Sequence, residues 1–190
     1  MKVDHQSIYY PPGGILIWIV IYLELLTFGI AIIAMAYQGM FNRVEFHQSS
    51  ELLNKTIATI NTVLLLSSGF GVAKGVSYYK SNLTIKASRY FNFAILTGIA
   101  FLILKLIEYY EKLETGHSMG ENDFFMFYWL LTGFHWIHVF IGVIILIFLR
   151  NSIIQQKEKS SFEDIEAGAT FWHMCDLIWL LLLPILYLLF

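Results

Sequence analysis

The sequence predicts an all-α, polytopic membrane protein with five transmembrane helices in a single membrane domain over residues 1–190. Hydrophobic residues make up 57% of the chain and charged residues only 14%, and the mean hydropathy is +0.64. A soluble domain of this length could not bury so much apolar surface, so its solvent is lipid. Each apolar stretch has about 21–26 residues, enough to cross a hydrocarbon core of ~30 Å. The predicted spans are residues 14–37, 56–79, 90–110, 124–149 and 168–190.

The first span follows Pro11-Pro12-Gly13, a sequence that breaks any earlier helix. Its apolar run is too long for a cleavable signal and carries Glu24 near the middle, so we interpret it as a retained helix. The linker at residues 38–55 is polar enough to form a loop or a short surface helix.

The second span is the least hydrophobic and collects small and hydroxyl residues, among them Asn61, Ser67, Ser68 and Gly69. Such residues let helix backbones approach closely and form hydrogen bonds across helices. We therefore expect this helix to pack against protein on most of its sides.

The third span carries two ionisable residues near its end, Lys105 and Glu108. Because residues three apart share one helix face, the two can neutralise each other as an ion pair. Alternatively, Lys105 extends its ammonium group to the membrane surface. Either arrangement is compatible with a purely structural role.

The fourth and fifth spans hold the densest group of polar side chains. His135 and His138 lie three residues apart and share one face, which in a membrane points inward toward other helices. His173 and Asp176 share a face of the fifth span in the same way. Nitrogen and oxygen donors of this kind can bind zinc, copper or iron.

Helix depth argues against a metal centre. The span limits place His138 about 16 Å from the cytoplasmic end of its helix, and His173 only about 7–8 Å from the same end of its own. Hydrogen bonds from imidazole to a carboxylate or a backbone carbonyl would satisfy these side chains without a metal.

Glu24 lies between leucines in the first span, where an isolated carboxylate is costly. One interpretation is a neutral carboxyl hydrogen-bonded to a neighbouring helix. The other is a proton-handling site that reacts with carbodiimides.

Five spans place the two termini on opposite sides of the membrane. Basic residues on the N-terminal side outnumber those on the other side by seven to three, which predicts a cytoplasmic N-terminus and an external C-terminus. The seven are Lys2, Lys80, Lys86, Arg89, Arg150, Lys157 and Lys159, and the three are Arg43, Lys55 and Lys112. A net charge of −2 without a basic block indicates no nucleic-acid partner.

Two motifs on consecutive spans identify a family. Residues 132–142 read TGFHWIHVFIG, and residues 172–180 read WHMCDLIWL. With Glu24 and Asn61-Thr62, they resemble subunit III of the haem-copper oxidases over nearly the whole chain. Five spans correspond to the short form of a family whose longer members have seven. The segments at residues 105–109 and 122–128 resemble the branch that accompanies nitric oxide reductases (NorE-like).

The resemblance implies a non-catalytic accessory subunit in a respiratory chain, in a membrane of the bacterial inner type. Haem and copper or iron would belong to a catalytic, subunit I-like partner, while this chain would bind phospholipid and support assembly and proton uptake. Glu24 would face the partner side, and Lys105 stands where mainstream oxidase subunits tend to have Gln. The side chains expected to hold the bundle are His135, His138, His173 and Asp176. Helix-packing positions are expected at Gly69, Gly133, Gly142, Trp172 and Trp179.

Two other functions remain to be compared with this one. A stand-alone membrane redox protein would use His135, His138 and His173 as haem or metal ligands. A small transporter would use Glu24 and Lys105 as ion sites, but the chain shows neither an inverted repeat nor interrupted spans.

Overall fold

The computed structural model describes residues 11, 13–155 and 162–190, and within them every regular element is a helix. Five of the six helices are long and apolar enough to cross a membrane, which confirms the predicted all-α membrane fold. The helices are α1 (Ile15–Phe41), α2 (Arg43–Glu51), α3 (Lys55–Lys80), α4 (Thr84–Glu114), α5 (Asp123–Gln155) and α6 (Phe162–Tyr187).

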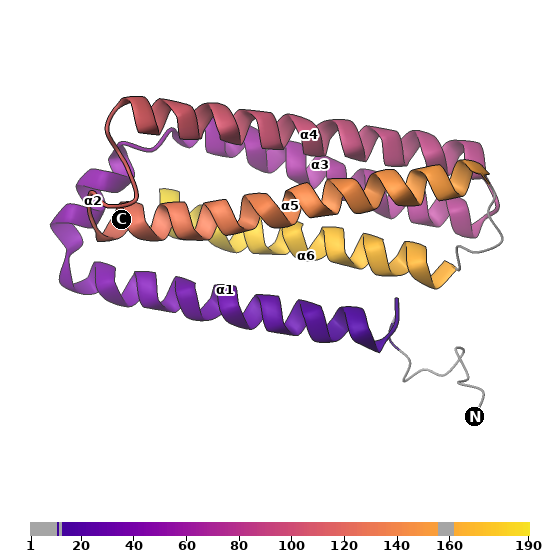
Figure 1. Ribbon diagram of the computed structural model, residues 1–190, viewed down its shortest axis with the longest axis horizontal. Helices are drawn as coiled ribbons and strands as arrows, with labels where there is room; N and C mark the ends of the chain where they lie inside the picture. Colours follow the sequence, from indigo (N-terminus) through magenta and orange to yellow (C-terminus); the bar gives the residue numbers. More distant parts are fainter. Residues whose placement is uncertain (1–10, 12, 156–161) are drawn as a thin grey trace.

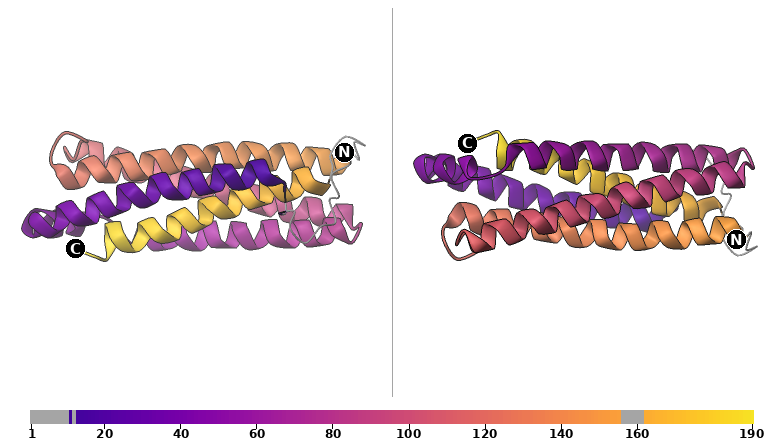
Figure 2. Two further views of the ribbon diagram at one scale, coloured as in Figure 1. Left: turned by 90° about the horizontal axis from the view of Figure 1, so that it is seen from below. Right: turned by 90° about the horizontal axis from the view of Figure 1, so that it is seen from above.

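The five long helices run along one common axis, and α2 sits at one end of the bundle (Figures 1 and 2). α3, α4, α5 and α6 form a four-helix body in which each helix contacts two others. α1 packs against α5 and α6 of this body. Its most apolar window is 11% buried, against 39–50% for the other spans, so most of the α1 surface is left to lipid or to partners.

The observed helices are longer than the predicted spans because polar end turns continue them beyond the hydrocarbon. α5 extends to Gln155, and α6 begins at Phe162 instead of residue 168. The polar linker contains α2, whose buried Phe46 packs against Phe124 and Phe190 at centroid distances of 5.5 and 5.1 Å. The short surface helix was therefore the correct alternative for much of this linker.

Local signals mark where several helices begin and end. The Asn54 side chain accepts hydrogen bonds from the amides of Thr56 and Ile57 and so caps α3. Asn122 accepts from the Phe125 amide at the start of α5 in the same way. Just after the end of α4, Gly116 has a φ of +87°, a conformation that favours glycine.

α3 is enclosed less than its composition predicted. Its small residues do admit α4, because Ser68 Oγ donates to the Ala94 carbonyl at 2.8 Å and an added Cβ at Gly75 would lie 2.9 Å from the Phe91 ring. The opposite face is open, however, with Val63 and Phe70 exposed. The expectation of packing on most sides is wrong for this chain by itself.

The C-terminal Phe190 lies beside the α1–α2 junction, because its carbonyl oxygen is 2.6 Å from His47 Nδ1. The first turn of α1 is at the other end of the bundle (Figure 1). An odd number of crossings explains this separation of the two chain ends. Which end faces the cytoplasm stays a prediction, and three of the basic residues behind it lie outside the described residues: Lys2, Lys157 and Lys159.

Candidate functional site: buried polar clusters

Lys105 and Glu108 form a closed polar cluster in the bundle core. The Lys105 Nζ lies 3.0 Å from Glu108 Oε2, and the two side chains are 1% and 0% exposed. This confirms the predicted ion pair and shows that the alternative, in which Lys105 reaches the membrane surface, is wrong. Nζ also donates to the hydroxyls of Tyr187 at 2.9 Å and Tyr128 at 3.3 Å. Both hydroxyls in turn donate to Glu108 Oε1, at 2.9 Å from Tyr128 and 2.7 Å from Tyr187.

Aromatic rings surround the ammonium group of Lys105. Nζ lies 4.9–5.6 Å from the ring centroids of Tyr128, Tyr109, Trp179 and Tyr187. A cation over a ring face is attracted by the ring quadrupole, and this attraction is larger where water is excluded. Every polar atom of the ion pair thus has a partner inside the chain, as a buried pair requires. The roles of Tyr128 and Tyr187 could not be predicted from the sequence, because nothing in their local pattern connects them to α4.

Glu24 and His138 join α1 to α5. His138 Nε2 lies 3.2 Å from Glu24 Oε2, while its Nδ1 is 2.8 Å from the Phe134 carbonyl of its own helix. Since only a protonated Nδ1 can bond that carbonyl, the ring presents Nε2 to the carboxyl group. The contact is at ion-pair distance but lacks hydrogen-bond alignment, and Glu24 Oε2 has no hydrogen-bond partner among the described residues.

His135 lies one turn away in an entirely different environment. Its ring is fully buried, stacks on Trp179 at 5.4 Å and meets the rings of Phe28 and Phe101 edge-on. Neither ring nitrogen has a hydrogen-bond partner among the described residues. His135 and His138 do share an inward face as predicted, but the expected hydrogen bond to a carboxylate or carbonyl is found only for His138.

His173 and Asp176 form a pair on α6 that faces α3. His173 Nδ1 lies 3.2 Å from Asp176 Oδ2, as their spacing predicted. That oxygen occupies the position where a side chain at Gly69 would begin, so only glycine leaves room for the carboxyl group there. His173 is 44% exposed, whereas Asp176 is 10% exposed and its second oxygen has no partner among the described residues.

The depth argument against a metal centre is wrong. His135 stacks on Trp179, and Gly142 lies against Trp172, so His138 is level with Asp176. The estimate took the span ends at residues 149 and 168 as level, whereas these contacts place residue 149 level with about residue 165. The polar side chains are kept apart because they point to different neighbours. Within residues 13–155 and 162–190, no three His, Cys, Asp or Glu side chains converge as metal ligands.

The remaining motif residues divide between packing and open surface. Trp172 fills the contact between α4, α5 and α6, since an added Cβ at Gly98 or Gly142 would lie 2.8 Å from its ring. Trp179 Nε1 donates to Thr62 Oγ1 at 3.0 Å, which ties α6 to α3.

Gly133 has no described atom within 4 Å of its Cβ position, so packing within the chain does not require glycine there. Asn61 is fully buried without a side-chain partner among the described residues.

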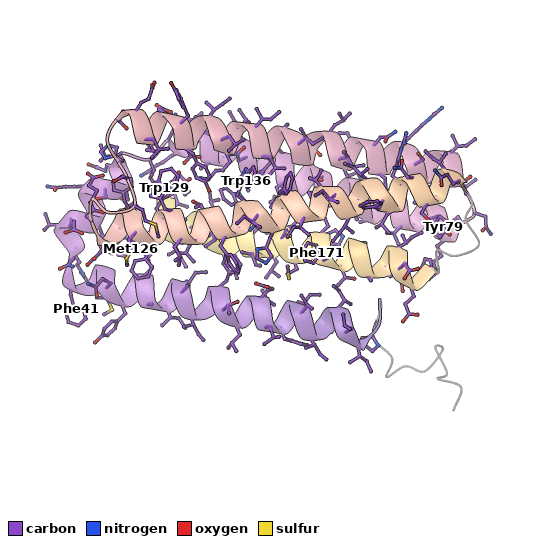
Figure 3. The ribbon with its side chains drawn as sticks, viewed as in Figure 1. Phe41, Tyr79, Met126, Trp129, Trp136 and Phe171 are labelled. Atoms are coloured by element: carbon purple, nitrogen blue, oxygen red, sulfur yellow. The ribbon has the colours of Figure 1, made fainter. Side chains whose placement is uncertain are left out.

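Two tryptophans of α5 line its contact with α4: Trp136 belongs to the motif at residues 132–142, and Trp129 precedes it. Figure 3 shows Trp129 and Trp136 along α5, and the Trp136 Nε1 donates to the Leu102 carbonyl of α4 at 3.2 Å. Trp129 Nε1 donates to the His117 carbonyl in the α4–α5 connection at 3.0 Å. The indole side chains therefore fix how α5 is rotated relative to α4.

Comparison with known proteins identifies the family. The family model described as cytochrome c oxidase subunit III matches residues 48–189. The chain belongs to the cytochrome c oxidase subunit III family. Cytochrome c oxidase subunit 3 of Synechocystis is 30% identical over 68% of this chain and 55% of its own length. The Corynebacterium diphtheriae subunit 3 is 25% identical over 85% of this chain and 81% of its own.

The share of each relative's own length that the alignment covers differs among these proteins. The alignment covers 88% of the Spodoptera frugiperda subunit at 33% identity, but only 49% of the Drosophila melanogaster subunit. The chain thus spans about half the length of several curated relatives, among them the Synechocystis and Drosophila proteins. The Lys105–Glu108 and His173–Asp176 pairs lie within the region that the family model matches, whereas Glu24 of α1 precedes it.

Proposed function

We propose that this chain is a non-catalytic, subunit III-like component of a haem-copper oxidase or nitric oxide reductase complex in a respiratory chain. The family match carries the proposal. The interior of the bundle supports it, because Lys105 and Glu108 satisfy each other and neighbouring tyrosines. Haem and copper or iron then belong to a catalytic, subunit I-like partner, and this chain supports assembly.

The histidine geometry disfavours the stand-alone redox alternative. A haem or metal needs its ligands to converge on one point. His135 is enclosed by aromatic rings, His138 faces Glu24, and His173 faces outward beside α3. The three imidazoles therefore present no common point at which a ligand set could form.

The nitric oxide reductase branch is proposed on the surroundings of Lys105. A Gln at this position, as in mainstream oxidase subunits, could not neutralise Glu108. Here the Glu108 carboxylate accepts hydrogen bonds from the Lys105 ammonium group and from the hydroxyls of Tyr128 and Tyr187. Because these side chains are arranged around a lysine, we assign the chain to the branch that accompanies nitric oxide reductases. The identity of the co-purified catalytic subunit tests this assignment.

A lipid site is proposed in the apolar groove between α1 and α5. This groove has a volume of about 430 Å³. Its walls are almost entirely hydrocarbon and aromatic, which suits an acyl chain: they consist of Phe28, Ala31, Leu130, Leu131, Phe134 and Ile137. Because α1 contacts the body along one side only, a bound phospholipid would also stabilise its position.

Support of proton uptake is proposed for the Glu24–His138 pair. Glu24 remains 23% exposed at the edge of the α1–α5 contact, and it faces an imidazole that can accept or donate a proton. Both side chains lie within membrane helices. The membrane proposed for this chain is the cytoplasmic membrane of bacterial type, with the N-terminus on the cytoplasmic side.

Purification from native membranes in mild detergent tests the proposed function. We expect the tagged chain to co-purify with a haem-bearing membrane protein in fixed stoichiometry, and the chain separated from that protein to lack haem absorbance. Stoichiometric haem or iron on the separated chain would favour the stand-alone redox function. The absence of any haem-bearing partner in the intact preparation would contradict the accessory role.

A further inference from the structure

A groove between α3 and α4 combines apolar walls with a basic mouth. It has a volume of about 610 Å³. Its walls face the surroundings of the chain, since Phe70 is 58% and Phe93 44% exposed. Arg89, in the second turn of α4, lines the mouth. The remaining lining residues are Leu66, Ser67 and Tyr90. One ligand can therefore contact a guanidinium group and hydrocarbon at the same time.

Two lysines stand beside this mouth. Lys74 Nζ lies 5.8 Å from the ring centroid of Phe70, which forms one wall of the groove. Lys86 Nζ lies 5.6 Å from the ring centroid of Tyr78, and the Tyr78 ring stacks on Tyr90 at 5.2 Å. Both lysines and the guanidinium group are exposed, and none of the three forms an ion pair within the part of the chain that the structure describes. The mouth therefore carries three cations that no described side chain neutralises.

These cations mark the level of the membrane surface on this face. An exposed ammonium or guanidinium group is costly in hydrocarbon, so long basic side chains extend to the headgroups. From Lys74 the α3 side of the groove continues to Leu66, about 12 Å further along the helix axis. The sequence carries no charged residue between Lys55 and Lys74, and none between Arg89 and Lys105. The groove therefore begins among the headgroups and runs into the hydrocarbon.

Charge selects the kind of occupant. The membrane supplies phosphate groups at this level without a partner protein, and basic side chains beside the surface attract anionic lipids. A zwitterionic phospholipid brings its own cation, which would need a carboxylate at the mouth. The α3–α4 connection and the start of α6 lie at the same end of the bundle (Figure 1). All acidic residues described at this end belong to α6: Glu163, Asp164 and Glu166. The mouth therefore favours a lipid with a net negative charge.

We propose that the α3–α4 groove binds one anionic glycerophospholipid of the phosphatidylglycerol kind. Arg89 and Lys74 hold its phosphate, because a guanidinium group matches two phosphate oxygens and the ammonium group adds a second charge. One acyl chain lies between Phe70 and Phe93. This site is separate from the groove between α1 and α5, whose described lining is hydrocarbon and aromatic. It does not depend on the accessory function, because the lipid contacts only this chain.

Native mass spectrometry of the full chain in mild detergent, titrated with phosphatidylglycerol or phosphatidylethanolamine, tests the charge of the site. We expect phosphatidylglycerol to bind at least about fivefold more tightly, and the double variant Arg89→Gln, Lys74→Gln to lose about twenty-five-fold in affinity for it, since each cation contributes about fivefold. The control is Lys55→Gln, Lys80→Gln, which removes the same charge; Lys80 Nζ lies instead over the Phe162 ring of α6. Equal affinity for both lipids would overturn the proposal, and so would an equal loss in the control variant.

Photolabelling in native membranes tests where the lipid lies. The probe is phosphatidylglycerol with a diazirine on one acyl chain, and the labelled residues are identified by peptide mass spectrometry. We expect label at Phe70 and Phe93, lowered at least fivefold in the Arg89→Gln, Lys74→Gln variant. Label confined to the α1–α5 groove would overturn the site. Crosslinking of the groove residues to another protein in place of the probe would overturn it as well. Neither result depends on whether a haem-bearing subunit co-purifies, so the accessory function is tested separately.

Discussion

Replacing Lys105 with Met tests how much the buried ion pair contributes to the stability of the bundle. Met keeps the length of the side chain but removes the ammonium group and its contacts with Glu108, Tyr128 and Tyr187. Both phenols donate to Glu108 Oε1, so Oε2 is left without a donor in the core. Removing one partner of a buried ion pair costs about 3–5 kcal/mol. We expect a loss of about 3 kcal/mol, because Oε1 keeps its two donors.

A second substitution separates the charge from the packing. In the Lys105→Met background, Glu108→Gln removes the uncompensated charge and retains the groups that bond the two phenols. We expect this double variant to recover about 2 kcal/mol of the loss, since neutral buried amides cost far less than a lone carboxylate. The non-additivity measures the coupling of the two side chains directly.

Unfolding of the purified chain by a denaturing detergent, followed by circular dichroism, measures these free energies. Lys74→Met is the control, because Lys74 is an exposed lysine in a membrane helix and its loss should change the unfolding free energy by less than about 0.5 kcal/mol. A Lys105→Met variant as stable as the Lys74→Met control would refute the reasoning. So would a double variant whose loss equals the sum of the losses of Lys105→Met and Glu108→Gln, each measured as a single variant.

Three further substitutions address the other contacts. Glu24→Gln should leave the unfolding free energy nearly unchanged, because the amide keeps hydrogen-bonding capacity and the α1 contact is partly exposed; a loss above about 1.5 kcal/mol would show that the charge is structural. His173→Leu should lower the unfolding free energy by about 1–3 kcal/mol more than Glu24→Gln does, since Asp176 loses its partner. Equal stability of the two variants would contradict this order. Gly142→Ala should destabilise the chain through the tryptophan 2.8 Å from the added methyl, whereas Gly133→Ala should be neutral or stabilising in the same assay.

Spacing along one helix was a reliable guide to pairs within that helix. The Lys105–Glu108 and His173–Asp176 pairs both follow from the rule that residues three apart share a face. Tyr187 could not be found in this way, because it lies 79 residues from Glu108 in the chain. Its arrival in the cluster depends on how α6 is rotated against α4.

Depth was estimated poorly from hydropathy, and this misplaced one helix against another. Hydropathy marks the apolar part of each span, but it does not say which turns of two neighbouring helices lie side by side. Contacts such as His135 with Trp179 show the true level of each turn. The imidazoles do not converge on one site, because each faces a different set of neighbouring side chains.

Composition and residue spacing were enough to establish five lipid-embedded helices, because hydrocarbon forces every backbone polar group into a helix and every long apolar run to a common length. They also identified the family through motifs on consecutive spans. The rotation and register of each helix were decided only by packing between helices. For that reason Lys105 is sealed among aromatic rings while His173 faces an open groove, although both stand in long apolar spans.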